Sequence, residues 1–148
     1  MGLGPLLWLI TYHPSPITKK KLMKQVQPAG QPQPKGHYSP GIVHNGLVYV
    51  SGQLPMDLET RQPFTGSVEE QTELALRNVE AVLKEAGSDL SQVLQMTIYV
   101  SDIELWAAVN EAYARVMDEH RPARAMIRVK DLHFGTKIEI AAIAAVRK

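Results

Sequence analysis

Three polar side chains stand among apolar neighbours, and all three are of types that do chemistry. Glu139 is the only charged residue in the run 138–146 (IEIAAIAAV), so its carboxylate needs a partner, a bound water or a cavity. Asn110 falls on the apolar face of a predicted helix, where its amide must hydrogen-bond something. Arg124 begins a predicted strand after the turn Arg121-Pro122-Ala123, which can aim its guanidinium out of the end of the sheet.

Each of these residues also has an ordinary structural explanation. An arginine at a strand end is usually a solvated cap, an inward asparagine usually bonds nearby backbone, and a glutamate in an apolar strand often reaches water. If the last two strands form a simple hairpin around residues 131–137, Arg124 lies well away from Glu139. Cooperation between the two would then require another strand or another subunit.

Other patterns that carry chemistry are missing from the sequence. The five histidines have neither i,i+4 nor H-x-H spacing, so nothing supports a metal site. The chain has no cysteine, which excludes disulfides, thiolate metal sites and a cysteine nucleophile. There is no glycine-rich phosphate loop or G-x-S-x-G motif, and we expect no cofactor. Ser51-Gly52 lies at a strand end where backbone N–H groups could face a ligand, which is an unspecific signal.

Length and composition indicate one soluble globular domain with a tail. Of the 148 residues, 45% are hydrophobic and 21% are charged. Residues 1–36 contain five lysines, no acidic residue and six of the ten prolines, whereas the rest of the chain has a net charge of −4 and no basic stripe. We therefore assign residues 1–35 to a flexible basic tail and residues 36–148 to the domain.

The apolar start MGLGPLLWLI does not have the features of a targeting segment. It lacks a preceding basic region and a small-residue cleavage site, and position 6 is a leucine, where myristoylation needs serine or threonine. Residues 1–22 are explained by an extended start before Met23 or by residues foreign to the natural chain. The alternative is an arm that packs on a neighbour or a membrane surface through Leu6, Leu7, Trp8 and Ile10. We expect a cytoplasmic protein.

Regular patterns begin after residue 37. Segments 42–44 and 47–51 flank Asn45-Gly46, the signal of a type I′ hairpin. The capping box Ser67 to Glu70, with Gly87 as the stop, predicts a helix over 68–86. Residues 93–100 are rich in β-branched side chains and predict a strand.

A second helix and two more strands complete the prediction. Asp102 is a good N-cap for a helix to about His120, with these side chains toward the core: Trp106, Val109, Tyr113, Val116 and Met117. Residues 124–129 alternate as a strand, and 138–146 are apolar on both faces, as in a central strand covered on each side. Two helices over one sheet make an α+β or two-layer α/β domain.

Six stretches, taken in order, resemble the YjgF/RidA family of enamine/imine deaminases: HYSPG (37–41), VYVSGQLP (48–55), EEQTELALRNVEAVLKEAGS (69–88), VNEAY (109–113), RPARAMIRV (121–129) and IEIAAIA (138–144). The resemblance covers roughly residues 30–147. It implies a chorismate-mutase-like α+β fold, a mixed sheet with two helices on one face, that forms a homotrimer with active sites at the subunit interfaces. It also implies that the last strand runs in the middle of the sheet.

The resemblance carries roles onto individual residues. Arg124 matches the arginine that binds the substrate carboxylate, and Glu139 matches the glutamate that positions water. Met126 matches the position whose backbone N–H contacts the carboxylate. The remaining matched positions line the same cleft: Tyr38, Ser51, Gly52 and Asn110.

The implied reaction is hydrolysis of a 2-imino or 2-enamino acid, such as 2-aminoacrylate, to a 2-keto acid and ammonia. The chain departs from many relatives at His133-Phe134-Gly135, Ala141 and Met126, where they have Pro-Lys-Gly, a second glutamate and a cysteine. Two alternatives remain, a translation inhibitor with ribonuclease activity and a trimer that binds keto acids without turnover. The acidic domain makes nucleic acid a poor partner.

Overall fold

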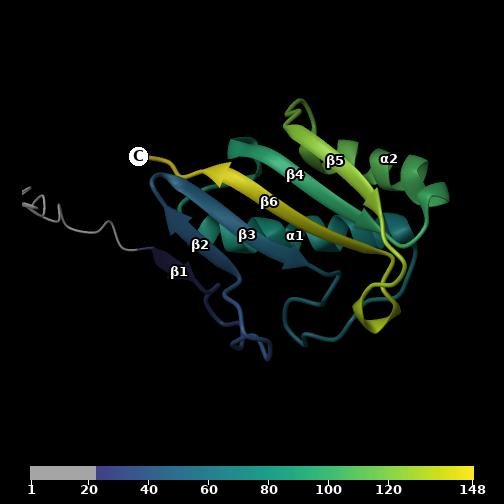
Figure 1. The fold of residues 1–148 in the computed structure, drawn as a ribbon, viewed down its shortest axis with the longest axis horizontal. Helices are drawn as coiled ribbons and strands as arrows, with labels where there is room; N and C mark the ends of the chain where they lie inside the picture. The colour runs from purple at the N-terminus through teal and green to yellow at the C-terminus, as the bar shows by residue number, and fades with distance from the viewer. Residues whose placement is uncertain (1–22) are drawn as a thin grey trace, which may run out of the picture.

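The computed structural model describes residues 23–148, which form one mixed sheet of six strands with two helices on one face (Figure 1). Residues 1–22 lie outside the described residues, so the predictions made for them are not tested. The regular elements are β1 (Lys24–Val26), β2 (Gly41–His44), β3 (Leu47–Gln53), α1 (Val68–Glu85), β4 (Val93–Val100), α2 (Trp106–Met117), β5 (Ala123–Arg128) and β6 (Ile138–Ala145), with short 3₁₀ turns at Leu90–Gln92, Ile103–Leu105 and His133–Gly135.

Strands β2 and β3 form the predicted hairpin. Asn45 and Gly46 have φ values of 51° and 78°, the left-handed conformation that a type I′ turn requires at both central positions. Strand β3 then pairs with β6, and its register shifts between Val50 and Gln53. A register shift of this kind takes residues out of the regular ladder, and here it falls at the edge of the candidate site.

Helix α1 begins at the predicted capping box. The Glu70 N–H donates to Ser67 Oγ, and the Ser67 N–H donates to Glu70 Oε2 at 3.1 Å. About two turns after Glu70, on the buried face of the helix, the Asn78 side chain donates to the carbonyls of Leu54 and Met56 at 2.8 and 2.9 Å. The helix therefore also fixes the loop that leaves β3.

Helix α2 is shorter than predicted. Asp102 caps a 3₁₀ turn by accepting from the Glu104 N–H at 3.0 Å, and the α-helix ends at Met117 because Asp118 adopts φ 50°. The prediction that Trp106 faces the core is wrong, since 45% of this residue is exposed. Trp106 is the first residue of α2, directly after the 3₁₀ turn.

The last strand lies in the middle of the sheet. The strand order is β1-β2-β3-β6-β4-β5, with β6 antiparallel to β3 and β4 and with β5 parallel to β4. The alternative of a simple hairpin between the last two strands is therefore wrong, and the topology implied by the resemblance is confirmed. Strand β1 was not predicted. It pairs with β2 and lies within the segment that we assigned to the tail.

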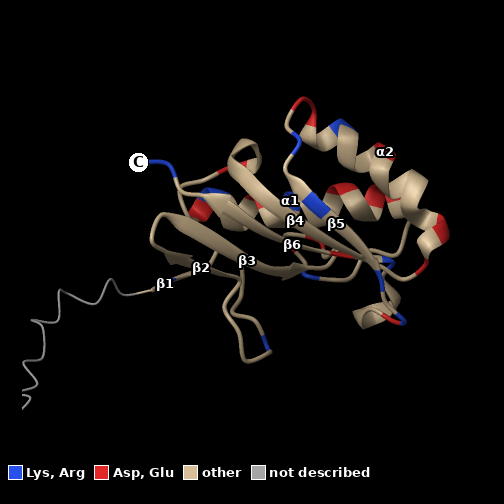
Figure 2. Cartoon of the chain, turned by 45° about the horizontal axis from the view of Figure 1, so that its top comes forward, with Lys and Arg blue, Asp and Glu red and all other residues tan. Residues whose placement is uncertain are grey.

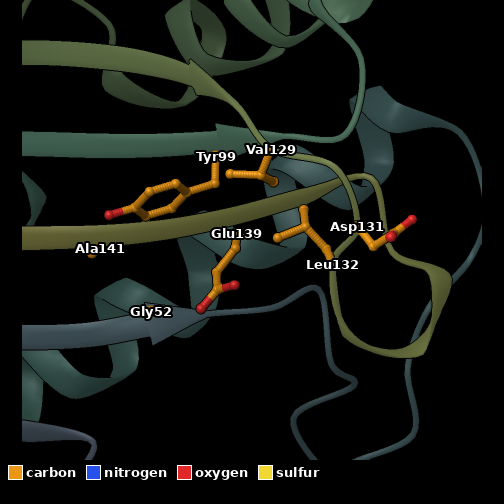
Figure 3. Close-up of a pocket in the computed structure, with 7 residues that line it drawn as sticks. All are labelled: Gly52, Tyr99, Val129, Asp131, Leu132, Glu139 and Ala141. Carbon is orange, nitrogen blue, oxygen red and sulfur yellow. The ribbon is translucent and has the colours of Figure 1, made fainter.

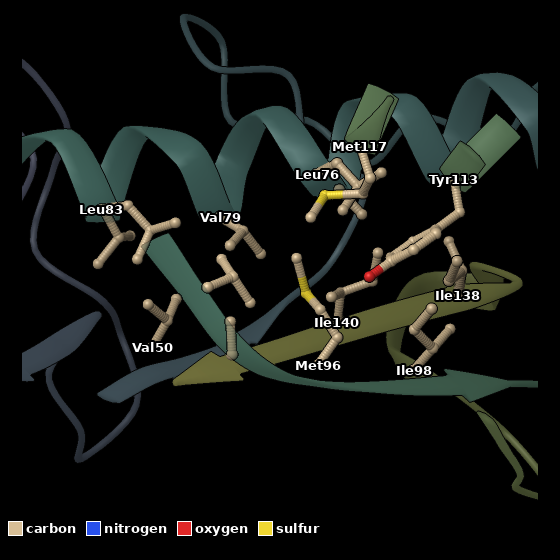
Figure 4. Packing of buried hydrophobic residues seen from close by; sticks show 14 of the residues in the cluster. Val50, Leu76, Val79, Leu83, Met96, Ile98, Tyr113, Met117, Ile138 and Ile140 are labelled. Atoms are coloured by element: carbon tan, nitrogen blue, oxygen red, sulfur yellow. The ribbon is translucent and has the colours of Figure 1, made fainter. Parts of the chain in front are cut away.

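The core fills the space between the sheet and the helices (Figure 4). Alternate residues of β6 are buried on this side, and they pack with side chains from both helices and from β4: Ile138, Ile140, Leu76, Val79, Leu83, Met96, Ile98, Tyr113 and Met117. Within the described residues, the other face of the sheet has no covering layer. On that face, Gln95, Thr97 and Glu139 lie among apolar and aromatic side chains: Ile42, Tyr49, Tyr99, Ile127, Ala141 and Ile143. The prediction that β6 is covered on both sides therefore holds for one face only.

Candidate active site

The Glu139 carboxylate lies on the open face of the sheet, against the backbone of Gly52. Glu139 pairs with Tyr99 across β4 and β6, and its side chain extends toward the end of β3 (Figure 3). A Cβ atom at Gly52 would overlap the carboxylate oxygen and would lie 2.9 Å from Cδ of Glu139. Glycine at position 52 therefore leaves the room that the carboxyl group occupies.

A pocket of about 310 Å³ opens beside this carboxylate. Its walls come from the ends of β3 and β4, from the first half of β6, and from the loop after β5: Gly52, Tyr99, Val129, Asp131, Leu132, Glu139 and Ala141. In Figure 3, Leu132 and Tyr99 lie on the side of the pocket away from Gly52. The lining contains two carboxylates and no basic side chain, so the pocket favours a neutral or cationic group next to Glu139.

Burial raises the pKa of Glu139 above the ordinary value of a glutamate, and the charge of His133 opposes the rise in part. None of the ion pairs formed within residues 23–148 includes this carboxylate. A half-buried carboxyl with a raised pKa exchanges protons closer to neutral pH than a solvated one. The group is therefore suited to take a proton from a water molecule and to return it.

Ser51 anchors the segment that carries Tyr38. Its hydroxyl donates to the carbonyl of Ser39 at 2.7 Å, and its N–H donates to the carbonyl of Pro40 at 2.9 Å. Tyr38 itself is 58% exposed and lies next to this anchor in the chain. The structure thus brings Tyr38 and Ser51 to the same end of β3 as Gly52, with the Ser51 hydroxyl committed to backbone.

Arg124 lies on the opposite face of the sheet from Glu139. It is in register with the buried residue Met96, and its guanidinium carbon is 4.8 Å from the centroid of the Tyr113 ring on α2. Asn110 is half-buried one helical turn before Tyr113. Arg124 on the outermost strand, β5, and Asn110 on α2 therefore form a second group of predicted site residues.

The backbone of Met126 faces the free edge of β5. The Val129 N–H donates to the carbonyl of Val100 at 2.9 Å, and successive residues of a strand turn their backbone groups to opposite sides. Arg124 and Met126 therefore direct their N–H groups away from β4. Because β5 ends the sheet, an anion can approach this N–H and the Arg124 guanidinium from the same side.

The seven predicted residues thus fall into two groups in one chain. Tyr38, Ser51, Gly52 and Glu139 lie at the end of β3, whereas Arg124, Asn110 and Met126 lie along β5 and α2. Strand β5 is two strands from β6, which is roughly 10 Å. The side chains of Arg124 and Glu139 also point to opposite faces of the sheet. Sequence reasoning missed the wall residues Tyr99, Val129, Asp131 and Leu132. Tyr99 meets Glu139 only through the pairing of β4 with β6, and the other three lie in the loop after β5, whose path the sequence does not specify.

The six-stranded mixed sheet with two helices on one face is an α+β fold, and comparison with known proteins identifies its family. Residues 29–146 match the family model described as Endoribonuclease L-PSP. The chain belongs to this family, which is the YjgF/RidA family.

Similar proteins come from all domains of life. A RutC family protein of Pyrococcus abyssi is 38% identical over 113 residues, which are 76% of this chain and 89% of that protein. The 2-iminobutanoate/2-iminopropanoate deaminase of Rattus norvegicus is 37% identical over 123 residues, 83% of this chain and 90% of the rat protein. Within residues 23–148, no helix has the length and apolar character needed to cross a membrane.

Solved structures resemble the whole fold. The structure of E. coli TdcF with bound serine superposes with a TM-score of 0.77 at 31% identity, covering 84% of this chain and 99% of that one. RidA from a Psychrobacter species also gives a TM-score of 0.77 at 31% identity, covering 83% and 99%. These structures extend the likeness from sequence to the arrangement of the six strands and two helices.

Proposed function

We propose that this chain hydrolyses 2-imino and 2-enamino acids, such as 2-aminoacrylate, to 2-keto acids and ammonia. The enamine tautomerises to the imine, water adds to the C=N carbon, and the C–N bond then breaks so that ammonia leaves and a ketone remains. Glu139 accepts the proton of the attacking water and returns it to the departing nitrogen. Relatives that carry the name 2-iminobutanoate/2-iminopropanoate deaminase support this assignment.

The observation that carries the proposal is the Glu139 carboxyl group in its pocket. It is half-buried, its pKa is raised, and it borders a space of about 310 Å³ with otherwise apolar or acidic walls. An imine nitrogen is basic, so two nearby carboxylates stabilise its protonated form, which water attacks more readily. The pocket therefore suits the charge that the reaction develops.

We further propose that a complete site needs two copies of the chain. Arg124 and Glu139 cannot meet one substrate within a single chain, because they lie on opposite faces and two strands apart. The uncovered apolar face of the sheet, with Tyr49 and Ile127 each 43% exposed, favours burial against other copies. In the homotrimer implied by the resemblance, the free edge of β5 in one subunit would bring Arg124 and the Met126 N–H to the Glu139 pocket of the next.

In such a site Arg124 would bind the substrate carboxylate through two parallel N–H···O bonds. That pairing fixes the imine carbon relative to the water held by Glu139. No step needs a metal or a cofactor, since imines already hydrolyse in water and the protein only orients the reactants.

The name of the family model suggests ribonuclease activity as a second function. A phosphodiester brought to the pocket would meet the carboxylates of Asp131 and Glu139 and no basic lining residue. Residues 37–148 also have a net charge of −4, which disfavours RNA binding. The charges therefore support the imine over the phosphodiester.

The test is the rate of pyruvate release while a serine dehydratase generates 2-aminoacrylate. We expect wild type to accelerate release and Glu139→Gln and Arg124→Ala to lose most of the acceleration. Arg128→Ala is the matched control, since Arg128 lies on the same strand and face as Arg124 but farther along, and it should behave as wild type. No acceleration by wild type, with pyruvate still binding through Arg124, would instead support a keto-acid-binding trimer.

A further inference from the structure

The Tyr113 ring is the one aromatic face that contacts Arg124 within the described residues. Tyr113 is only 6% exposed and is held between α2 and the sheet by the core, whereas Arg124 is half-buried at the edge. The guanidinium carbon lies 4.8 Å from the ring centroid, within the range of a cation–π contact. A fixed ring thus lies under a side chain that otherwise has many rotamers.

The Tyr113 hydroxyl takes no part in this contact. It has no hydrogen-bond partner among the described residues, and in Figure 4 it points into the core toward Ile140 and Met96. Burial raises the pKa of Tyr113, so the ring remains a neutral phenol. Tyr113 therefore contacts Arg124 through its ring face and not through its hydroxyl.

The position of Arg124 over the ring leaves its N–H groups free to bind an anion. A guanidinium stacks through its face but binds a carboxylate through its N–H edge. Arg124 belongs to none of the ion pairs found within residues 23–148, so no acidic side chain occupies that edge. An ion pair in place of the ring would hold the side chain equally well but would compete with the substrate.

We propose that Tyr113 is a positioning residue that holds the Arg124 guanidinium in its carboxylate-binding orientation, an inference that rests on the proposed function. Fixing the rotamer in the free protein removes an ordering cost from substrate binding. The Tyr113 ring should affect the affinity for the substrate carboxylate and not the chemical step, because the ring touches neither the imine carbon nor Glu139. Loss of the ring should therefore weaken binding and leave the chemical step unchanged.

Three variants separate the ring from the rest of the core. Tyr113→Phe keeps the aromatic face and removes only the unpaired hydroxyl. Tyr113→Leu keeps an apolar side chain and removes the face. Met117→Ala is the matched control, because Met117 lies one turn along α2 in the same core and its truncation loosens the helix without removing the ring.

Two measurements are made on each variant. The first is the NMR shift of the Arg124 Nε–H group, which the ring current of an aromatic face moves upfield and which does not depend on turnover. The second is KM and kcat for 2-aminoacrylate hydrolysis. For Tyr113→Leu we expect the upfield shift to vanish and KM to rise roughly threefold to tenfold with kcat within about twofold of wild type.

Tyr113→Phe and Met117→Ala should both keep the upfield shift and the wild-type KM. The proposal is overturned if Tyr113→Leu leaves KM and the shift unchanged, if Tyr113→Phe is as impaired as Tyr113→Leu, or if Met117→Ala raises KM equally. If wild type shows the upfield shift and no turnover, the proposed function fails while the contact between Arg124 and the Tyr113 ring stands.

Discussion

Replacing Gly52 by alanine should remove most activity without unfolding the protein. The added Cβ would overlap the Glu139 carboxylate oxygen and would lie 2.9 and 3.2 Å from its Cδ and Cγ atoms. Ordinary contacts of this type need about 3.5 Å or more, so the carboxyl group must retreat by on the order of 1 Å. A displacement of that size at a reacting group can cost roughly a hundredfold in rate.

The same change should cost little stability. The clashing atoms belong to the flexible end of a side chain that faces a pocket, and Gly52 is not among the glycines with positive φ. An off-rotamer Glu139 costs about 0.5–1.5 kcal/mol, and alanine in place of glycine recovers about 0.4–1 kcal/mol through the unfolded chain. The free energy of unfolding should therefore change by less than about 1 kcal/mol.

The assay pairs pyruvate release from 2-aminoacrylate with urea unfolding. Gly46→Ala is the control, because it introduces backbone strain without a steric clash. Gly46 has φ 78°, and an added Cβ meets no atom within 4 Å. This variant should lose stability through backbone strain and keep its activity. Full activity in Gly52→Ala would refute the assignment of Glu139, and a loss of activity that merely follows a loss of folded protein would refute the steric argument.

Three further predictions concern charge, capping and assembly. Because burial raises the Glu139 pKa, ionising this group opposes folding. The free-energy cost of ionising Glu139 in the folded protein is absent at a pH below the ordinary glutamate pKa and is fully present above the raised pKa. Glu139→Gln should therefore raise the free energy of unfolding at pH 7 but not at pH 3. The acid limb of wild-type kcat should likewise have a midpoint above an ordinary glutamate pKa, and a limb at or below 4 would contradict this. Ser67→Ala should lower the free energy of unfolding by about 1 kcal/mol, measured in urea, with activity unchanged. Tyr49→Asp, on the uncovered face of the sheet, should lower the mass measured by sedimentation and abolish turnover; an active variant of wild-type mass would contradict the two-copy site.

The elements specified by neighbouring residues could be predicted from the sequence. The Asn45-Gly46 turn and the Ser67 capping box are set by local conformation and by hydrogen bonds over three residues, and both are present in the structure. Strand β1 has one buried residue, Val26, and owes its conformation to pairing with a distant strand. No local sequence pattern predicts such a strand.

The candidate site was predictable as a set of residues but not as an arrangement. Glu139 stood out because a lone carboxylate in an apolar strand demands an explanation. That Arg124 faces the other side of the sheet depends on its parallel register with Met96, which chain order alone does not fix. Tyr113 looked like an ordinary core residue for the same reason, since its contact with Arg124 joins two elements through the fold.

The central position of β6 has a consequence for how the chain folds. Strands β3 and β4 lie on either side of it and precede it in the chain by about forty residues or more, so their facing edges stay unpaired until β6 arrives. Every pairing that β6 makes is therefore remote in sequence, the kind of contact that slows folding. During synthesis the half-built sheet exposes two open edges, and a nascent chain of this family should depend on late insertion of one strand to become protected from association.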